Sequence, residues 1–289
     1  MFEFKRLDKR SKAILYLINS ALFFALMSVF VKLSGDIPAL EKSFFRNIVS
    51  FVVAFYLVAK NKSLFFGKKE NRKLLFFRAL FGTIGLTANF YAISHLVLSD
   101  ANMLNQLSPF FVVIFSSIFL KEKIKKEQFI MLFTAFLGGM FIIRPSFSFE
   151  VVPALIGLLS AVAAGSAYTF LRALSGKENS STIVFFFSAF SLVSLIPFII
   201  FDYTPITLVQ LLELIVAGIC ASVGQFSITA AYKNAPAKEI SIYSYTQILF
   251  TTVFGIVIFD QIPTLMSFIG YFIVISASIM MFFYNKKHH

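Results

Sequence analysis

The sequence predicts an all-α polytopic membrane protein in which ten transmembrane helices form two inverted five-helix repeats. Three observations lead to this fold class. Hydrophobic residues make up 58% of the 289 residues and charged residues only 14%, whereas a soluble domain carries about 25% charged residues. The chain contains ten apolar stretches of the length that a helix needs to cross a bilayer, about 20 residues. The first and second halves also share weak sequence similarity in constant register.

Clusters of Gly, Pro, Asn and charged residues separate the apolar stretches, and such clusters end helices. Examples are GDIP after the first stretch and KNAPAK after the eighth. The expected spans are 13–33, 40–60, 74–95, 100–120, 127–145, 152–172, 181–201, 211–232, 240–259 and 264–284. The charged N-terminal segment leads into a full-length span, so no cleavable signal peptide is expected. The lone cysteine, Cys220, excludes an internal disulfide.

Basic residues are distributed very unequally between the two sides of the predicted bundle. Of the 26 Lys and Arg residues, 21 lie in the N-terminal segment, the even-numbered loops with their adjoining span ends, or after the last span. Cytoplasmic loops carry the excess of Lys and Arg. We therefore expect cytoplasmic N- and C-termini and a multi-pass protein of the cell (plasma or inner) membrane. Topology accounts for the net charge of +12, so a nucleic-acid partner is not expected.

An internal repeat relates the two halves. A shift of 139 residues aligns Gly85 with Gly224, Ala92 with Ala231 and Asp100 with Glu239. Because each half holds an odd number of spans, the second half enters the membrane from the opposite side. The sequence thus predicts two five-helix repeats, at 1–145 and 146–289, in the inverted arrangement that many secondary transporters use for alternating access.

A group of amides interrupts the apolar span at 100–120. Asn102, Asn105 and Gln106 are spaced i, i+3 and i+4, which places them on one face of a helix. The repeat aligns them with Ser241, Ser244 and Tyr245. Single amides in a membrane helix often only bond neighbouring helices, worth about 1 kcal/mol each or less. A polar stripe that recurs in both halves favours a cavity instead.

Three segments resemble the EamA family of the drug/metabolite transporter superfamily. They are FFRNIVSF (44–51), the run FYAISHLVLSDANMLNQLSPFFVVIFSSIFLKEKI (90–124) and GQFSITAAYKNAPAKEISIYSYTQILFTTVFGIVIFDQIP (224–263). The resemblance implies ten helices around a central cavity and transport of a substrate that it does not specify. The second copy has Ile248 where the first has Pro109, and Gln261 where the family has an acidic residue. We therefore expect a kinked span at 100–120 and a straighter one at 240–259.

Polar residues in seven spans are candidates for binding substrate. The candidates are Asn19, Arg46, Asn89, Asn102, Asn105, Gln106, Ser166, Tyr168, Gln225, Tyr243, Ser244, Tyr245 and Gln247. Arg46 lies about 10 Å from the outer end of its span, and a charge at that depth indicates either a functional site or a side chain that snorkels to the headgroups. For Arg78, near a span end, snorkelling is the expectation. Asp100 and Glu239 are expected to stabilise helix N-termini.

No Asp or Glu lies in the middle of a predicted span, which disfavours permanently cationic substrates. We therefore expect a secondary transporter of neutral or zwitterionic amphipathic metabolites such as amino acids, working by alternating access and most simply as an exporter. The alternative is an uptake carrier for a nucleoside-like or sulfonium metabolite. A channel is less favoured because of the inverted repeat. An intramembrane enzyme is not expected either, because Cys220 and His95 lie at different depths and HExxH and GxSxG are absent.

The expected partners are a small-molecule substrate and the lipid bilayer. No catalytic residue, metal site or cofactor is expected. The sequence leaves open whether transport is coupled to protons or another ion, and whether the protein is a monomer or a weak homodimer.

Overall fold

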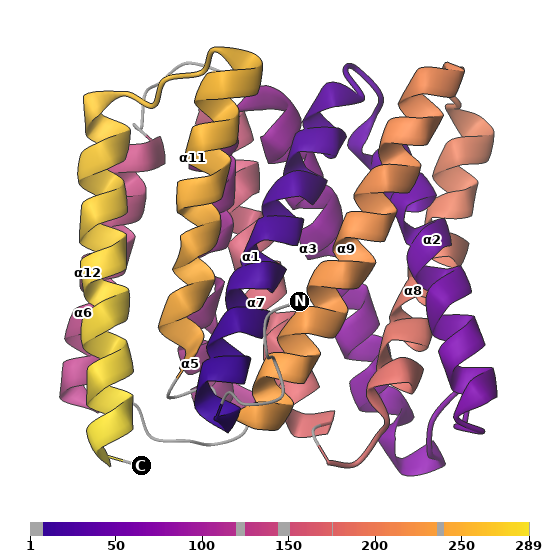
Figure 1. Ribbon diagram of the computed structural model, residues 1–289, viewed down its shortest axis with the longest axis horizontal. Helices are drawn as coiled ribbons and strands as arrows, with labels where there is room; N and C mark the ends of the chain where they lie inside the picture. Colours follow the sequence, from indigo (N-terminus) through magenta and orange to yellow (C-terminus); the bar gives the residue numbers. More distant parts are fainter. Residues whose placement is uncertain (1–7, 120–124, 144–150, 175, 236–239, 289) are drawn as a thin grey trace.

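The chain folds into antiparallel helices that cross the molecule from edge to edge (Figure 1). The computed structural model describes residues 8–119, 125–143, 151–174, 176–235 and 240–288. The first half holds α1 (Lys9–Leu33), α2 (Ala39–Lys60), η1 (Lys69–Asn71), α3 (Arg72–His95), α4 (Leu98–Asn105), α5 (Ser108–Phe119) and α6 (Lys126–Ile143). The second half holds α7 (Val152–Leu174), α8 (Ser180–Phe201), α9 (Leu208–Asn234), η3 (Ser241–Tyr245), α11 (Thr246–Phe259) and α12 (Leu265–His288).

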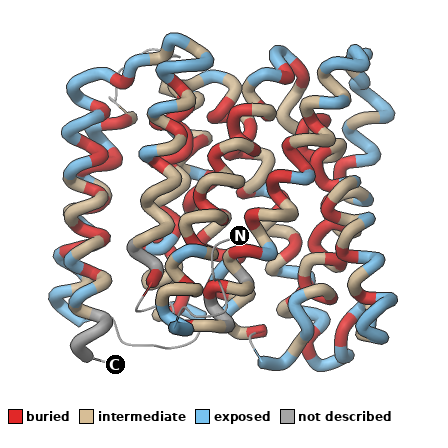
Figure 2. The backbone as a smooth tube through the Cα atoms, in the orientation of Figure 1, coloured by how far each residue is buried: buried red, intermediate tan, exposed pale blue. Residues whose placement is uncertain are grey.

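The length and composition of these helices confirm the prediction of an all-α polytopic membrane protein. Within the described ranges, nine helical stretches are long and apolar enough to cross a membrane. A shorter apolar helix, Tyr243–Phe259, occupies the position of the expected span at 240–259. Large exposed side chains such as Val193, Phe201 and Phe272 cover the outside of the bundle, and the buried residues face inward (Figure 2). Such an apolar surface suits contact with lipid.

Helix packing follows the inverted repeat. In sequence α1 corresponds to α7, α2 to α8, α3 to α9 and α6 to α12. The most extensive interhelical contacts join α1 to α9 and α3 to α7, which are equivalent pairs under this correspondence. The pairs α2–α8 and α6–α12 each join a helix to its own counterpart, at opposite ends of the bundle (Figure 1). The two repeats are therefore interleaved. Helix α1 lies in the middle of the bundle and begins on the same side, the lower one in Figure 1, as that on which α12 ends.

Glycines allow several of these helix pairs to approach closely. A Cβ added to Gly138 of α6 would lie 3.0 Å from the carbonyl oxygen of Gly270 in α12, and one added to Gly270 would lie 2.7 Å from that of Gly138. On α7, a Cβ at Gly165 would collide with Phe111 of α5. Close backbone approach through small residues is how membrane helices gain packing energy, since lipid gives no hydrophobic drive between them.

The expected kink at Pro109 is confirmed as a complete break of the helix. The α4 helix ends at Asn105, and α5 restarts at Ser108. Proline has no N–H to donate and its ring clashes with the carbonyl four residues earlier, so the helix is interrupted just before Pro109, which lies in the first turn of α5. In the second half, Ile248 lies within an uninterrupted α11, but a 3₁₀ segment precedes that helix. The expectation of a straighter span therefore holds only from Thr246 onward.

Several expected features lie outside the described residues. These are the LKEKI segment at 120–124, the carboxylate of Glu239, the side chain of Ser241 and the boundary between the two repeats. At the start of α1, Asp8 accepts a hydrogen bond from the backbone N–H of Ser11 (3.4 Å). The contact with Ser11 lowers the pKa of the Asp8 carboxyl.

Candidate functional site

A cluster of amide and hydroxyl groups lies where the broken span 98–119 meets the start of α11. The side-chain N–H of Gln106 is 3.3 Å from Oε1 of Gln247 and 3.5 Å from the carbonyl of Ser244. The Tyr245 hydroxyl is 3.4 Å from the carbonyl of Gln106 and donates to it. Four of the candidate residues from two repeat-related spans thus lie together, and all four are half-buried.

Further hydrogen bonds connect this cluster to α1 and α12. The Gln247 amide donates to Oδ1 of Asn102 (2.9 Å), and Ser28 of α1 donates to the same oxygen (3.1 Å). Ser278 of α12 donates to the Tyr245 hydroxyl (2.6 Å). We call Ser28, Asn102, Gln106, Ser244, Tyr245, Gln247 and Ser278 the amide cluster.

The two serines of the amide cluster were not predicted. Ser28 and Ser278 are single hydroxyls in apolar helices, and each shares its one proton between the amide cluster and the carbonyl four residues earlier in its own helix. That arrangement is common in membrane helices. No sequence signal distinguishes the two from serines that serve only packing.

A second polar group lies among α2, α3, α8 and α9. A small cavity of about 30 Å³ is lined there by Arg46, Ser50, Arg78, Ser188, Ser222 and Gln225, together with apolar side chains. Arg46 is only 7% exposed and donates to Oδ1 of its neighbour Asn47 (2.7 Å). The Arg78 guanidinium lies 4.3 Å from the centre of the Phe187 ring. Neither arginine snorkels to a membrane surface, so the expectation for Arg78 was wrong.

Three candidate residues bond neighbouring helices or their own helix instead of joining either group. Asn19 donates to Ser227 of α9 (2.8 Å), and Asn105 donates to Ser160 of α7 (3.0 Å). Ser166 donates to the carbonyl of Val162 in its own helix (3.1 Å).

The other three lie apart from the amide cluster as well. Asn89 is buried, and its Oδ1 has no hydrogen-bond partner among the described residues. Tyr243 packs against an apolar cluster around Leu17 and Ala231. Tyr168 lies within electrostatic range of both arginines.

Asp100, Cys220 and His95 lie in structural positions away from the amide cluster. Asp100 is 5% exposed in the first turn of α4 and accepts hydrogen bonds from Ser267 (3.1 Å) and Tyr271 of α12. It therefore ties α4 to α12 in addition to its favourable position at a helix N-terminus. Cys220 lies in an apolar cluster, and His95 is exposed with Nδ1 2.9 Å from the carbonyl of Tyr91. The described residues contain no group of His, Cys, Asp and Glu suited to a metal.

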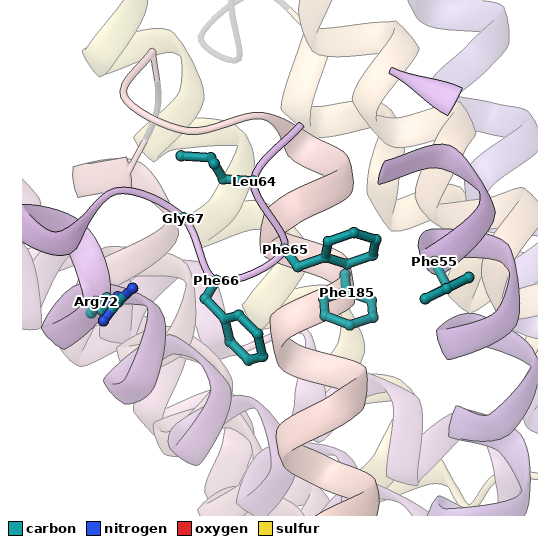
Figure 3. Close-up of a pocket in the computed structure, with 7 residues that line it drawn as sticks. All are labelled: Phe55, Leu64, Phe65, Phe66, Gly67, Arg72 and Phe185. Carbon is teal, nitrogen blue, oxygen red and sulfur yellow. The ribbon is translucent and has the colours of Figure 1, made fainter. Parts of the chain in front are cut away.

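Another cavity is an open apolar hollow (Figure 3). It has a volume of about 440 Å³ and lies between the loop after α2 and the start of α8, with Phe55, Phe65, Phe66 and Phe185 on its walls. The rings of Phe65 and Phe185 are 5.0 Å apart. Arg72 supplies the only charged side chain of this lining. A specific small-molecule site needs several convergent polar groups, so the amide cluster is the better candidate.

Comparison with known proteins identifies the class to which this fold and site belong. The model of the EamA-like transporter family matches residues 11–144 and 152–283, one copy in each half. The chain belongs to the EamA-like transporter family and is a multi-pass membrane transporter.

Its relatives include transporters from bacteria and animals. The pseudopaline exporter of Pseudomonas aeruginosa is 31% identical over 276 residues, covering 94% of this chain and 96% of that protein. Solute carrier family 35 member G1 of Mus musculus is 30% identical and covers 86% and 72%. A riboflavin transporter of Brucella anthropi is 25% identical and covers 84% and 87%. A crystal structure at 16% identity superposes with a TM-score of 0.66 over 96% of this chain and 99% of that one, which shows a shared fold.

Proposed function

We propose that the protein is a secondary transporter of neutral or zwitterionic amphipathic metabolites, such as amino acids, working by alternating access. We further propose that it exports them across the cell (plasma or inner) membrane, with both termini in the cytoplasm. The observation that carries this proposal is the amide cluster at the interruption of two spans related by the inverted repeat. Transporters with inverted repeats bind substrate near the bilayer midplane, at discontinuous helices of this kind.

The chemistry of the amide cluster suits an uncharged or zwitterionic polar ligand. Amides and hydroxyls both donate and accept hydrogen bonds, so Gln106, Gln247 and Tyr245 can bond an amino group or another polar group of such a ligand. The bonds of Gln106 are 3.3 and 3.5 Å long, at or beyond the end of the normal range for N–H···O. Bonds this weak are readily exchanged for bonds to a substrate.

Packing between the repeat-related spans supports alternating access. The α4 segment packs against α11, and the backbone N–H of Leu98 donates to Oε1 of Gln261 (3.1 Å). Opening a path between α4 and α11 requires these two helices to separate. That separation breaks the bond from Leu98 to Gln261 and the hydrogen bonds that join the two spans in the amide cluster. A ligand between the two spans competes for the same groups, so its binding and the movement are coupled.

Direction and orientation rest on charge and on one relative. The bias of Lys and Arg predicts cytoplasmic termini, and the pseudopaline exporter matches nearly the full length of the chain. The alternative is an uptake carrier for a nucleoside-like or sulfonium metabolite, and the charges of Arg46 and Arg78 would repel the sulfonium cation.

Counterflow in proteoliposomes tests the proposal. Vesicles loaded with one unlabelled metabolite from a panel of amino acids and related compounds receive the same compound labelled outside. We expect transient, saturable accumulation for at least one member of the panel and none in protein-free vesicles. Flux that rises linearly without counterflow would identify a channel, and no flux for any compound would refute the proposed substrates. Repeating net transport with an imposed proton or sodium gradient identifies the coupling ion.

A further inference from the structure

Residues with unsatisfied polar atoms line the cavity among α2, α3, α8 and α9. In the part of the chain that the structure describes, five buried side-chain nitrogen or oxygen atoms have no hydrogen-bond partner. Three of the five belong to the lining of this one cavity, namely Nε of Arg46, Nε of Arg78 and Oγ of Ser188. Ser188 is fully buried and Arg46 is 93% buried. Buried polar groups are nearly always bonded, so three together indicate a site for a ligand.

Neighbouring residues hold the two guanidinium groups in place. Arg46 donates to Asn47, which in turn donates to Ser191 of α8 (2.7 Å). Arg78 lies on the Phe187 ring and across Gly82, where an added Cβ would be 2.5 Å from Nη1 of Arg78. Glycine at position 82 therefore leaves the room that the guanidinium occupies.

The charge in this cavity is uncompensated. Across the described ranges, neither Arg46 nor Arg78 forms an ion pair, and the two positive charges repel each other. Arginine stays charged in proteins, and burial of a charge is costly unless it is paired. The nearby Tyr168 is neutral at pH 7 in its ordinary form, so it supplies no counter-charge. An anion would remove this cost.

We propose that Arg46 and Arg78, with Ser188, bind the carboxylate of the transported metabolite. This inference rests on the proposed function and narrows its substrates to compounds with a free carboxylate. Guanidinium groups match a carboxylate in shape and bond it in pairs of charge-assisted hydrogen bonds. The cavity volume of about 30 Å³ exceeds what one water needs, roughly 10–15 Å³, and suits the head of a carboxylate.

Acetate binding to the purified protein in detergent tests the inference without requiring transport. Melting temperature is measured against acetate concentration at constant ionic strength, with phosphate and chloride as comparison anions. The variants are Arg46→Gln, Arg78→Gln and Ser188→Ala. Arg72→Gln is the matched control, because Arg72 is exposed at the start of α3.

We expect acetate to stabilise the wild type and Arg72→Gln more than chloride or phosphate does. Affinity for acetate should fall about tenfold or more in Arg46→Gln and Arg78→Gln, because charge-assisted bonds are lost. Without acetate, both variants should melt at or above the wild-type temperature, since an unpaired buried charge has gone. Ser188→Ala removes only an unbonded hydroxyl, so it should melt normally and bind acetate more weakly.

Three results would overturn the inference. One is an equal rise in melting temperature with all three anions, which would indicate charge screening without a specific site. The second is unchanged acetate affinity in the arginine variants. The third is normal acetate binding by Ser188→Ala combined with arginine variants that melt far below the wild type without acetate, which assigns the arginines a structural role. Failure of counterflow with intact acetate binding would instead refute the proposed function and leave the anion site standing.

Discussion

Replacing Gln106 by leucine separates a substrate-binding role of the amide cluster from a purely structural one. Leucine is a good helix former of similar size, and Gln106 lies at the C-terminal end of α4. The change removes two long hydrogen bonds, to Gln247 and Ser244. A neutral hydrogen bond contributes about 0.5–1.5 kcal/mol, and bonds beyond 3.2 Å fall at the low end. Gln247 retains its bond to Asn102, so we expect a loss of stability of about 1 kcal/mol or less.

A ligand bonded to Gln106 would lose more than the protein does. A polar substrate group left facing leucine costs about 1–3 kcal/mol, which is a 5- to 150-fold loss of affinity. We therefore expect Gln106→Leu to lower the apparent affinity in counterflow by at least about fivefold, with a melting temperature near that of the wild type.

The neighbouring amide is a matched control. Asn105 precedes Gln106 in sequence but donates to Ser160 of α7 at 3.0 Å, a normal hydrogen bond. Asn105→Leu should therefore reduce stability by about 1–3 kcal/mol and leave substrate affinity little changed. Wild-type affinity in Gln106→Leu, together with a melting temperature as low as that of Asn105→Leu, would refute the binding role.

Three further predictions concern topology, packing and access. A reporter fused after residue 289 should be active only in its cytoplasmic form, and activity only of the external form would contradict the charge argument. Gly165→Ala should lower stability by about 1–3 kcal/mol, because the new Cβ collides with Phe111, and an unchanged melting temperature would disprove that contact. In a cysteine-free background, a cysteine at Tyr245 should react with an aqueous reagent and be protected by substrate. A cysteine at Phe250, the comparison position, should not be protected.

The sequence was informative where polarity breaks a long apolar pattern. The recurring stripe identified Asn102, Gln106 and Tyr245, which the structure brings together. It was misleading for Asn105, which contacts α7 instead. The reason is that successive helical residues point about 100° apart, so Asn105 and Gln106 lie on opposite margins of the stripe and face different helices.

Arg78 shows a different limit of sequence reasoning. Its distance from the span end says how deep its Cα lies but not whether the side chain points toward headgroups or protein. That direction is decided by Phe187 and Gly82. Gly82 lies one helical turn after Arg78, and only the position of α8 beside α3 makes that spacing meaningful.

The interleaved packing of the two repeats restricts how the transporter moves. Because α1 is held along α9 and α3 along α7, separating the first half of the chain from the second would dismantle the largest interfaces of the molecule. Under the proposed alternating access, the bodies that move against each other must therefore each combine helices of both halves. One such body contains α1, α9 and α11, and its inverted counterpart contains α7, α3 and α5. Residues distant in sequence then move together, while α4, which packs against both α11 and α7, lies at the boundary between the two bodies.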